Sequence, residues 1–504
     1  MKKTAIVLTL LAAFGVSAAS FVTYEEFGAV GDGKTDDQAA IVAAHAAANE
    51  KGLPVKATDG KTYFIGKGAK TAVVKTDVDF GTAQFLIDDV GLKNIHKPIF
   101  SIEPSRKSEK VTGVSALKAG QARLAAKLPG PSLVVAENKN ALQYIRYGAN
   151  QNNGTAQKEV FLVDASGAID PRTPITFDFA ALTALKAHPL EAKRLTVRGG
   201  RFTTIANQAE SRYTYHDRNI QVRRSNVLIT GLRHDVTGEL DHGAPYGGFI
   251  NISTCANVTV SNCTLTAHRT YSTIGSAGRP VSMGSYDLLV NTAARVSFID
   301  CRQTTDIHDG RYWGLFASNF CKDLLFDRCI FSRFDAHMGV ANATILNSEL
   351  GHMGINAIGF GTFRVENTKV CGRHFFNLRS DYGSTWHGDF IIKNCVYKPR
   401  GGARPEIVGG QANDRHDFGY ACAMPRRLVI DGLVIDDEKH PGSYEGPYIF
   451  NNLNPADKPG APEPPYPYQV TEEVVLHNVK VASGRPLLVS PNKHMFRKTK
   501  VTTK

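Results

Sequence analysis

The 504-residue sequence predicts an all-β protein, a parallel β-helix in which short strands stack coil upon coil. From Leu195 onward one plan recurs: a short apolar strand, a turn carrying Asn, Asp or Gly, and a second apolar pair. The repeats are LTVRGGRF, NVLITGLRH, NVTVSNCTL, ARVSFIDCR, KDLLFDRCIF, ATILNSEL, TFRVENTKV, DFIIKNCVY, RRLVIDGLVI and EVVLHNVKV. A repeated strand plan with variable loops is typical of solenoids, whose coils bury their strands against their neighbours.

A small side chain recurs one or two residues after the strand in successive repeats. The positions are Cys263, Cys301, Cys329, Ser348, Thr368 and Cys395. This recurrence predicts a ladder stacked inside the solenoid, which a β-sandwich would not require. Free cysteine behaves as a small buried hydrophobe, so we expect most of the eight cysteines to be reduced, with one or two disulfides left open.

Residues 1–19 have the features of a secretory signal peptide. Lys2 and Lys3 precede the apolar run from Ile6 to Ala13, and small residues follow at a suitable cleavage position. The alternative is a buried N-terminal helix. We therefore expect a periplasmic or secreted protein without a membrane span, because the remaining apolar stretches are too short.

The net charge of +12 favours an acidic partner, and an anionic polysaccharide or a membrane surface would fit. A merely basic surface is the plainer explanation. A nucleic-acid partner is not expected, because the expected location is outside the cytoplasm and the sequence has no zinc-finger or helix-turn-helix pattern.

Residues 20–75 predict an N-terminal cap of the β-helix. A Gly-rich turn in FGAVGDGKTDD leads into an Ala-rich helix that ends near Gly52, and TYFIGKG follows. This segment resembles the cap of the pectin-lyase-like right-handed parallel β-helix superfamily, which includes pectate lyases, polygalacturonases and phage tailspikes. The resemblance implies a right-handed solenoid whose open end is covered by the helix.

The rest of the chain divides into three parts. Residues 76–190 predict irregular early coils with an inserted β subdomain. Residues 191–492 predict the regular β-helix that carries the active site. Residues 493–504 form a basic C-terminal tail, which we expect to be frayed.

The polygalacturonase motifs survive only as fragments, TDIHD from Thr305 and GHMG from Gly351, so that mechanism is not transferred. Four pieces resemble a branch of bacterial β-helix proteins connected with polysaccharide lyases that act on uronic-acid polymers, such as glycosaminoglycans. They are PYGGFINISTCANVTVSNCTL, GRYWGLFASNFCKDL, FSRFDAHMGVANATI and LRSDYGSTWHGD.

Equal offsets from the ladder position predict one chemical face. Arg333 is four residues after Cys329, and His352 is four after Ser348. His337 and Asn356 are each eight residues after those positions. We expect the face to hold His268, Arg333, His337 and His352, with Arg379, Asp381 and Tyr382 one coil further.

A uronate lyase must neutralise the C6 carboxylate, remove the C5 proton and protonate the leaving oxygen. Arg333 and Arg379 are candidates for the first task, because guanidinium binds carboxylate through two hydrogen bonds. His337 is the candidate base. Tyr382 is the candidate acid, with His352 as its alternative.

Further residues are candidates for substrate binding. They are His268, Arg311, Tyr312, Trp313, Asp335, Asp381, Trp386 and His387. The aromatic side chains could stack on sugar rings, while Asp335 could orient His337 or Arg333. Plainer roles remain open: a polar surface for the histidines, an ion pair for Arg333 with Asp335, and loop packing for Trp386.

Two other functions remain open from the sequence. A glycoside hydrolase could use Asp306 or Asp309 with Asp335 or Asp381 as its two carboxyl groups. A tailspike-like or adhesin-like solenoid could bind a glycan without cleaving it. No cofactor is indicated, although carboxylates could hold Ca²⁺ without any diagnostic ligand spacing.

Overall fold

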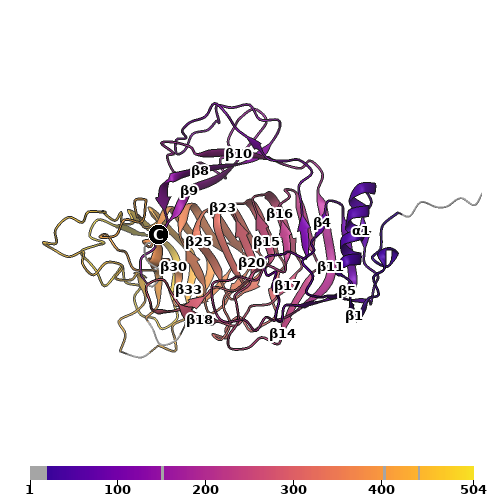
Figure 1. Cartoon of the computed structure of the whole chain (residues 1–504). Coiled ribbons are helices and arrows are strands. Elements are labelled where there is room, and N and C mark those ends of the chain that lie inside the picture. The colour runs from indigo at the N-terminus through magenta and orange to yellow at the C-terminus, as the bar shows by residue number, and fades with distance from the viewer. Residues whose placement is uncertain (1–19, 149–152, 401–403, 441–442) are drawn as a thin grey trace, which may run out of the picture.

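The structure is a computed structural model that describes residues 20–148, 153–400, 404–440 and 443–504. The predicted signal peptide, residues 1–19, lies outside the described residues. Figure 1 shows a long solenoid with a helix at its N-terminal end and a separate group of strands projecting from one side. The fold is the predicted right-handed parallel β-helix with an N-terminal capping helix.

The strands of the solenoid pair in three parallel columns, which we name face 1, face 2 and face 3. Face 1 contains β4 (Ala72–Val74), β6 (Phe100–Ile102), β12 (Ile220–Val222), β15 (Gly247–Ser253), β20 (Tyr286–Asn291), the first parts of β23 (Phe316–Asp327) and β25 (Phe334–Leu346), β27 (Ile355–Ala357), β30 (His374–Leu378), β32 (Glu406–Gly409) and β34 (Tyr448–Phe450).

Face 2 follows face 1 within each coil. It contains β2 (Val55–Lys56), the first parts of β5 (Val78–Asp88) and β11 (Leu195–Ile205), β13 (Val227–Thr230), β16 (Ala256–Ser261), β21 (Ala294–Ile299), the second parts of β23 and β25, β28 (Gly359–Glu366), the first parts of β31 (Trp386–Pro399), β33 (Arg427–Ile435) and β35 (Glu473–Val481), and β36 (Lys500–Thr503).

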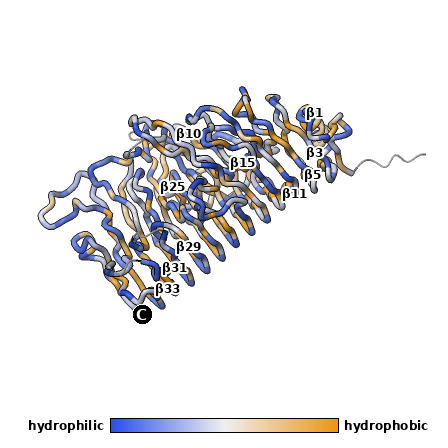
Figure 2. The backbone as a smooth tube through the Cα atoms, turned by 90° about the horizontal axis from the view of Figure 1, so that it is seen from below, coloured by the Kyte–Doolittle hydropathy of each residue, from blue (hydrophilic) through white to orange (hydrophobic). Residues whose placement is uncertain are grey.

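Face 3 completes the coil. It contains β1 (Asp32–Asp36), β3 (Thr62–Ile65), the second parts of β5 and β11, β14 (Arg233–Thr237), β17 (Thr264–Leu265), β22 (Arg302–Gln303), β24 (Ile330–Phe331), β26 (Glu349–Leu350), β29 (Lys369–Gly372) and the second parts of β31, β33 and β35. Apolar and polar residues alternate along the coils in Figure 2, as expected for strands with one face inside the solenoid.

The cap consists of the short helix η1 (Glu25–Phe27), β1 and the helix α1 (Gln38–Lys51). Helix α1 ends at Gly52, whose φ of 67° suits the left-handed C-terminal cap. It buries Ile41, Ala44 and Ala48 against the end of the solenoid core. This covers strands that would otherwise be an exposed end.

The predicted ladder lies at the turn between face 2 and face 3. The Ser348 hydroxyl accepts a hydrogen bond from the backbone of Cys329 (3.0 Å), and the Thr368 hydroxyl accepts one from the backbone of Ser348 (3.2 Å). The preceding Asn347 and Asn367 have φ of 50° and 47°, a left-handed conformation that Asn tolerates. The eight cysteines are free and buried, in line with the expectation of mostly reduced thiols.

The insert between β6 and β11 forms a separate antiparallel sheet. Its strands run in the order β7 (Glu109–Lys110), β10 (Ala184–Pro189), β8 (Ser132–Gln143) and β9 (Thr155–Val163). Leu133, Val160 and Leu162 pack on Ala256 and Ala294, which begin two face 2 strands. The insert therefore lies over the corner where face 1 turns into face 2, and the β8–β9 hairpin projects along the solenoid toward its C-terminal coils (Figure 1).

The remaining strands are a small hairpin of β18 (Tyr271–Ile274) and β19 (Pro280–Met283), and the last helix-like turn is η2 (Ser380–Tyr382). The C-terminal tail is not frayed, because β36 pairs in parallel with β35 and closes the last coil. Within the described residues, no helix has the length and apolar character needed to cross a membrane.

Candidate functional site

His337 and Tyr382 meet at the corner between face 1 and face 2. The Tyr382 hydroxyl lies 3.3 Å from Nε2 of His337, and the two rings are edge to face with centroids 5.4 Å apart. His337 stands in β25 beside an irregularity in its pairing with β23. Tyr382 comes from η2, two coils further along the solenoid. The fold therefore brings together the predicted base and acid.

Asn319 sets the orientation of the imidazole. Its side-chain oxygen lies 2.9 Å from Nδ1 of His337 and accepts a hydrogen bond from the Nδ1–H group. Nε2 then carries the lone pair and accepts a hydrogen bond from the Tyr382 hydroxyl. Burial, and after it the charge of Arg379, lowers the pKa of His337 to about 3, so the ring is neutral at neutral pH.

Tyr382 is held as a neutral phenol. Burial raises the pKa of Tyr382 to about 12, although Arg146 and Arg379 oppose the rise. Their guanidinium carbons lie 5.1 Å and 5.6 Å from the centre of the Tyr382 ring. The pair therefore consists of a neutral base and a protonated acid beside two positive charges.

Arg379 joins two carboxylates. It donates to Asp335 Oδ1 (2.8 Å) and to Asp381 Oδ2 (2.9 Å). Burial raises the pKa of Asp381, but Arg379 and Arg146 outweigh it and hold that pKa well below its usual range. Asp381 is therefore a permanent anion that positions the two arginines.

The insert supplies three site residues that the sequence did not reveal. Arg146 donates to Asp381 Oδ2 at 2.6 Å, and the backbone of Tyr147 donates to the carbonyl of Asp381 at 3.0 Å. The Tyr144 ring packs edge to face on Tyr382 at 5.8 Å. The start of the β8–β9 loop thus lies against the His337–Tyr382 pair. No sequence pattern within the insert predicts this contact.

Arg333 stands immediately before β25, the strand that carries His337. It pairs with buried Asp335 at 2.7 Å and lies over the ring of Trp313 at 4.9 Å. Its side chain is only 4 % exposed. Arg333 thereby supports Asp335 and, through it, Arg379, in line with the structural ion pair considered from the sequence.

Residues at equal offsets from the ladder position are no longer equivalent beyond the corner between face 3 and face 1. The turn between β26 and β27 holds two more residues than the turn between β24 and β25. As a result Asp335, rather than His337, pairs with Asn356. Arg333 and His352 therefore do not occupy equivalent positions, and the single face predicted from equal offsets is wrong.

His352 lies at a different corner of the solenoid. Its Nδ1 is 2.9 Å from the carbonyl oxygen of Ile307. It lines a pocket of about 210 Å³ together with His308, Cys371 and Lys398. The hydrogen bonds, ion pairs and ring contacts of the described residues do not join it to His337 or Tyr382, so it is no alternative acid for that pair.

His268 is inside the molecule rather than on the chemical face. It is 1 % exposed, with Nδ1 at 3.0 Å from Glu239 and Nε2 at 3.5 Å from Asp287. Burial opposes its protonation, but Asp287 and Glu239 together raise the pKa of His268 to about 9. It forms a buried ion-pair network and cannot bind a polymer.

Trp386 is also a core residue. It is fully buried between Phe363 and Phe390, and its Nε1 donates to the carbonyl of Gly361 at 3.0 Å. Neighbouring His387 stacks on Phe360. The expectation that Trp386 stacks on a sugar ring is therefore wrong, because the odd–even alternation of β31 points it inward.

His387 lines a larger pocket of about 510 Å³ between the insert and the solenoid. Asn138, Gln157, Phe177 and Tyr420 also line it. Tyr420 donates to the carbonyl of Tyr382 at 2.9 Å and therefore links this pocket to the catalytic candidates.

Arg311 and Tyr312 lie in the loop between β22 and β23. Arg311 is exposed and pairs with Asp309 at 2.5 Å. Its guanidinium lies 5.9 Å from the Tyr312 ring. Hydrogen bonds from Arg311 hold the pKa of Asp309 below its usual range, so Asp309 is poorly suited to act as the acid of a glycosidase.

Comparisons with known proteins place the fold. No protein-family model and no curated protein sequence matches the chain. Among solved structures, the tailspike gp61 of Pseudomonas phage phi297 is similar with a TM-score of 0.55 and 11% identity, covering 96% of this chain and 84% of that one. The tailspike gp49 of Pseudomonas phage LKA1 gives a TM-score of 0.50 and 13% identity, with 91% and 81% covered.

A third similar structure is the Gp54 tailspike of Acinetobacter baumannii bacteriophage AP22, in complex with A. baumannii capsular saccharide. Its TM-score is 0.50 at 12% identity, and 96% of this chain and 79% of that one are covered. At such identities the likeness concerns the path of the backbone alone. The chain shares with these tailspikes the parallel β-helix fold.

Proposed function

We propose that the protein is an exported polysaccharide lyase that cleaves an acidic, uronic-acid-containing polymer by β-elimination. The observation that carries this proposal is the 3.3 Å contact between His337 Nε2 and the Tyr382 hydroxyl, beside Arg379 and Arg146. A neutral base, a protonated acid and positive charge are the three parts that elimination next to a carboxylate needs.

In the proposed reaction the substrate carboxylate binds near Arg379 and Arg146. This spreads charge away from C5 and makes its proton more acidic. Nε2 of His337 takes that proton, and the electron pair forms the C4–C5 double bond. The bond from C4 to the glycosidic oxygen breaks, and the leaving oxygen takes the proton of the Tyr382 hydroxyl.

The direct contact between His337 and Tyr382 allows their starting protonation states to be restored after each reaction. After the reaction His337 carries a proton and Tyr382 lacks one, and transfer across their hydrogen bond returns both to their starting states. The same closeness means that base and acid approach the sugar from one side. The geometry therefore favours syn elimination, in which the C5 proton and the C4 oxygen leave from the same face of the ring.

The low pKa of His337 does not prevent it from acting as a base. After burial, the largest contribution to lowering that pKa is the charge of Arg379. A bound substrate carboxylate would neutralise that charge and raise the basicity of Nε2 when it is needed. The formal net charge of +12 also favours an anionic polymer.

The comparisons support the parallel β-helix fold, and one tailspike of similar fold is in complex with a capsular saccharide. The secreted or periplasmic location is inferred from the N-terminal sequence. The hydrolase alternative is weaker, because Asp381 is a permanent anion and cannot donate a proton.

A panel of polymers tests the proposal. The purified protein is incubated with hyaluronan, chondroitin sulfate, heparin, alginate and polygalacturonate. We expect one of them to yield unsaturated ends that absorb in the ultraviolet. New reducing ends without that absorbance would identify a hydrolase, and binding without cleavage would identify a glycan-binding solenoid; either outcome overturns the proposal.

A further inference from the structure

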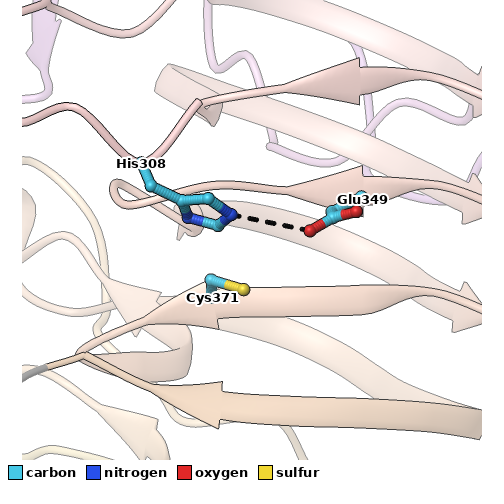
Figure 3. Close-up of side chains that lie close together, drawn as sticks. All are labelled: His308, Glu349 and Cys371. Carbon is cyan, nitrogen blue, oxygen red and sulfur yellow. Dashed lines mark ion pairs between the residues drawn. The ribbon is translucent and has the colours of Figure 1, made fainter. Parts of the chain in front are cut away.

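A cluster of metal-binding side chains lies away from the His337–Tyr382 pair. His308, Glu349 and Cys371 each offer a ligand atom, and these atoms lie within 4.8 Å of one another (Figure 3). His308 comes from the loop between β22 and β23, while Glu349 and Cys371 stand on the successive face 3 strands β26 and β29. Three separate segments thus converge on one point.

Cys371 differs from the other cysteines of the chain. The other seven thiols each donate to a backbone carbonyl, whereas no hydrogen bond of the described residues involves the Cys371 thiol. Cys371 also lies outside the ladder position and outside the main apolar core. It is nevertheless only 5 % exposed, and it lines the pocket that contains His308. A buried thiol without a partner is directed at an imidazole and a carboxylate.

The geometry fits a metal ion that is coordinated tetrahedrally and accepts nitrogen, oxygen and sulfur ligands. In a tetrahedral zinc site the ligand atoms are roughly 3.3–3.7 Å apart, given bonds of about 2.0–2.3 Å. His308 Nε2 and Glu349 Oε1 are 3.6 Å apart. A set of one nitrogen, one sulfur and one oxygen suits Zn²⁺, whereas Ca²⁺ takes about 6–8 oxygen ligands.

Two neighbouring lysines would lower the affinity of the site for a cation without blocking it. Lys369 pairs with Glu349 Oε1 at 2.7 Å, and Lys398 lines the same pocket. A carboxylate has a second oxygen, and the partly exposed Lys369 side chain can turn toward solvent. Burial raises the pKa of the Cys371 thiol, and Lys369 and Lys398 oppose that rise; a bound cation would itself favour the thiolate.

We propose that His308, Glu349 and Cys371 bind one zinc-like divalent cation, with the fourth position open to water. The ion would fix the loop between β22 and β23, which also carries Trp313 to its contact with Arg333. This site is independent of the proposed elimination chemistry.

Cobalt binding tests the proposal on the full-length protein. After chelation and dialysis, Co²⁺ is titrated under reducing conditions. We expect one Co²⁺ per chain, a thiolate-to-cobalt charge-transfer band, and loss of that band when Zn²⁺ is added. Cys371→Ala should abolish the band, while Cys422→Ala, which changes another buried free thiol outside the main core, should keep it. Absence of the band in the natural protein, or its survival in Cys371→Ala, would overturn the site.

Two further measurements do not depend on that variant. His308→Ala changes a side chain that is 47 % exposed, so it should fold normally. It should weaken binding by at least about tenfold, because even partners outside the coordination shell contribute about 10–100-fold. Zn²⁺ should also protect Cys371 of the natural protein from alkylation, measured by peptide mass spectrometry; equal labelling with and without Zn²⁺ contradicts the proposal.

Discussion

Nε2 of His337 and the hydroxyl of Tyr382 lie 3.3 Å apart although 45 residues separate them along the chain. Their contact depends on two strands of face 1 and on the η2 turn that follows the later one. Asn319 holds the imidazole from the other side. The proposed chemistry can be tested at each of these contacts.

Removing either partner should abolish elimination without unfolding the protein. On the polymer that yields unsaturated ends, we expect His337→Ala and Tyr382→Phe each to lower kcat by about 10²–10⁴, the usual contribution of general acid–base catalysis. The double variant should lose little more than either single one, because the two residues act as a unit. Ultraviolet absorbance measures the rate, and circular dichroism checks the fold. Full activity in His337→Ala would exclude this base.

The pH dependence of kcat/KM should show an unusually low acid limb. His337 accepts a proton only while neutral, and its pKa of about 3 in the folded protein lies below the ordinary value of about 6.5. Activity is therefore retained as pH falls through about 6.5 and is lost only well below it. Initial rates across a constant-ionic-strength buffer series measure this. An inflection of kcat/KM near about pH 6.5 that moves in the Asn319→Ala variant would mean that the His337 imidazole is solvated, and would contradict the prediction.

Arg146 should contribute to substrate binding from the insert. Its side chain is 24 % exposed and already charge-paired with Asp381. We expect Arg146→Ala to raise KM by about tenfold, in keeping with about 1.5–3 kcal/mol for a charged hydrogen bond, and Arg146→Lys to recover part of the loss. Arg123→Ala, a change of an exposed arginine in the same insert, is the matched control. Equal effects of the two alanine variants would show that the insert acts only through its overall charge.

The capping helix should make the fold sensitive to acid. His45 of α1 is fully buried against the Tyr24 hydroxyl, and burial lowers its pKa to about 3. Below about pH 6.5 the unfolded chain binds a proton that the folded chain excludes, so the free energy of unfolding falls by up to about 1.4 kcal/mol per pH unit until about pH 3.

His45→Gln removes this titration. Urea unfolding of both proteins at several pH values should therefore show a difference in free energy of unfolding that shrinks as pH falls from about 6.5. A difference that stays constant with pH would mean that His45 is solvated in the folded protein.

Several features of the solenoid could be read from single repeats. The strand runs predicted the coils, and Ser348 and Thr368 predicted the ladder, because both depend on local alternation and on residues at short, regular spacing. The Asn, Asp or Gly of each repeat predicted the turn for the same reason, and Asn347 takes up a left-handed conformation there. The position of Trp386 was also open to prediction, since Phe390 four residues later points into the core from the same side of the strand.

The active-site residues depended on contacts between distant segments. Equal spacing placed His352 beside Arg333, but two extra residues in one turn moved it to another corner. Arg146 reaches Asp381 across 235 residues of sequence. No local pattern encodes such a contact, because it follows from how the insert packs over the solenoid.

The sequence by itself determined the solenoid, its cap and its internal ladder, since stacking makes each repeat bury the same positions. Only the tertiary structure decided which polar residues share a surface. Turn lengths shift the register by whole residues, and one such shift separated His352 from the candidate site. Contacts between distant segments buried His268 against Glu239 and Asp287 and left His337 facing Tyr382 beside Arg146.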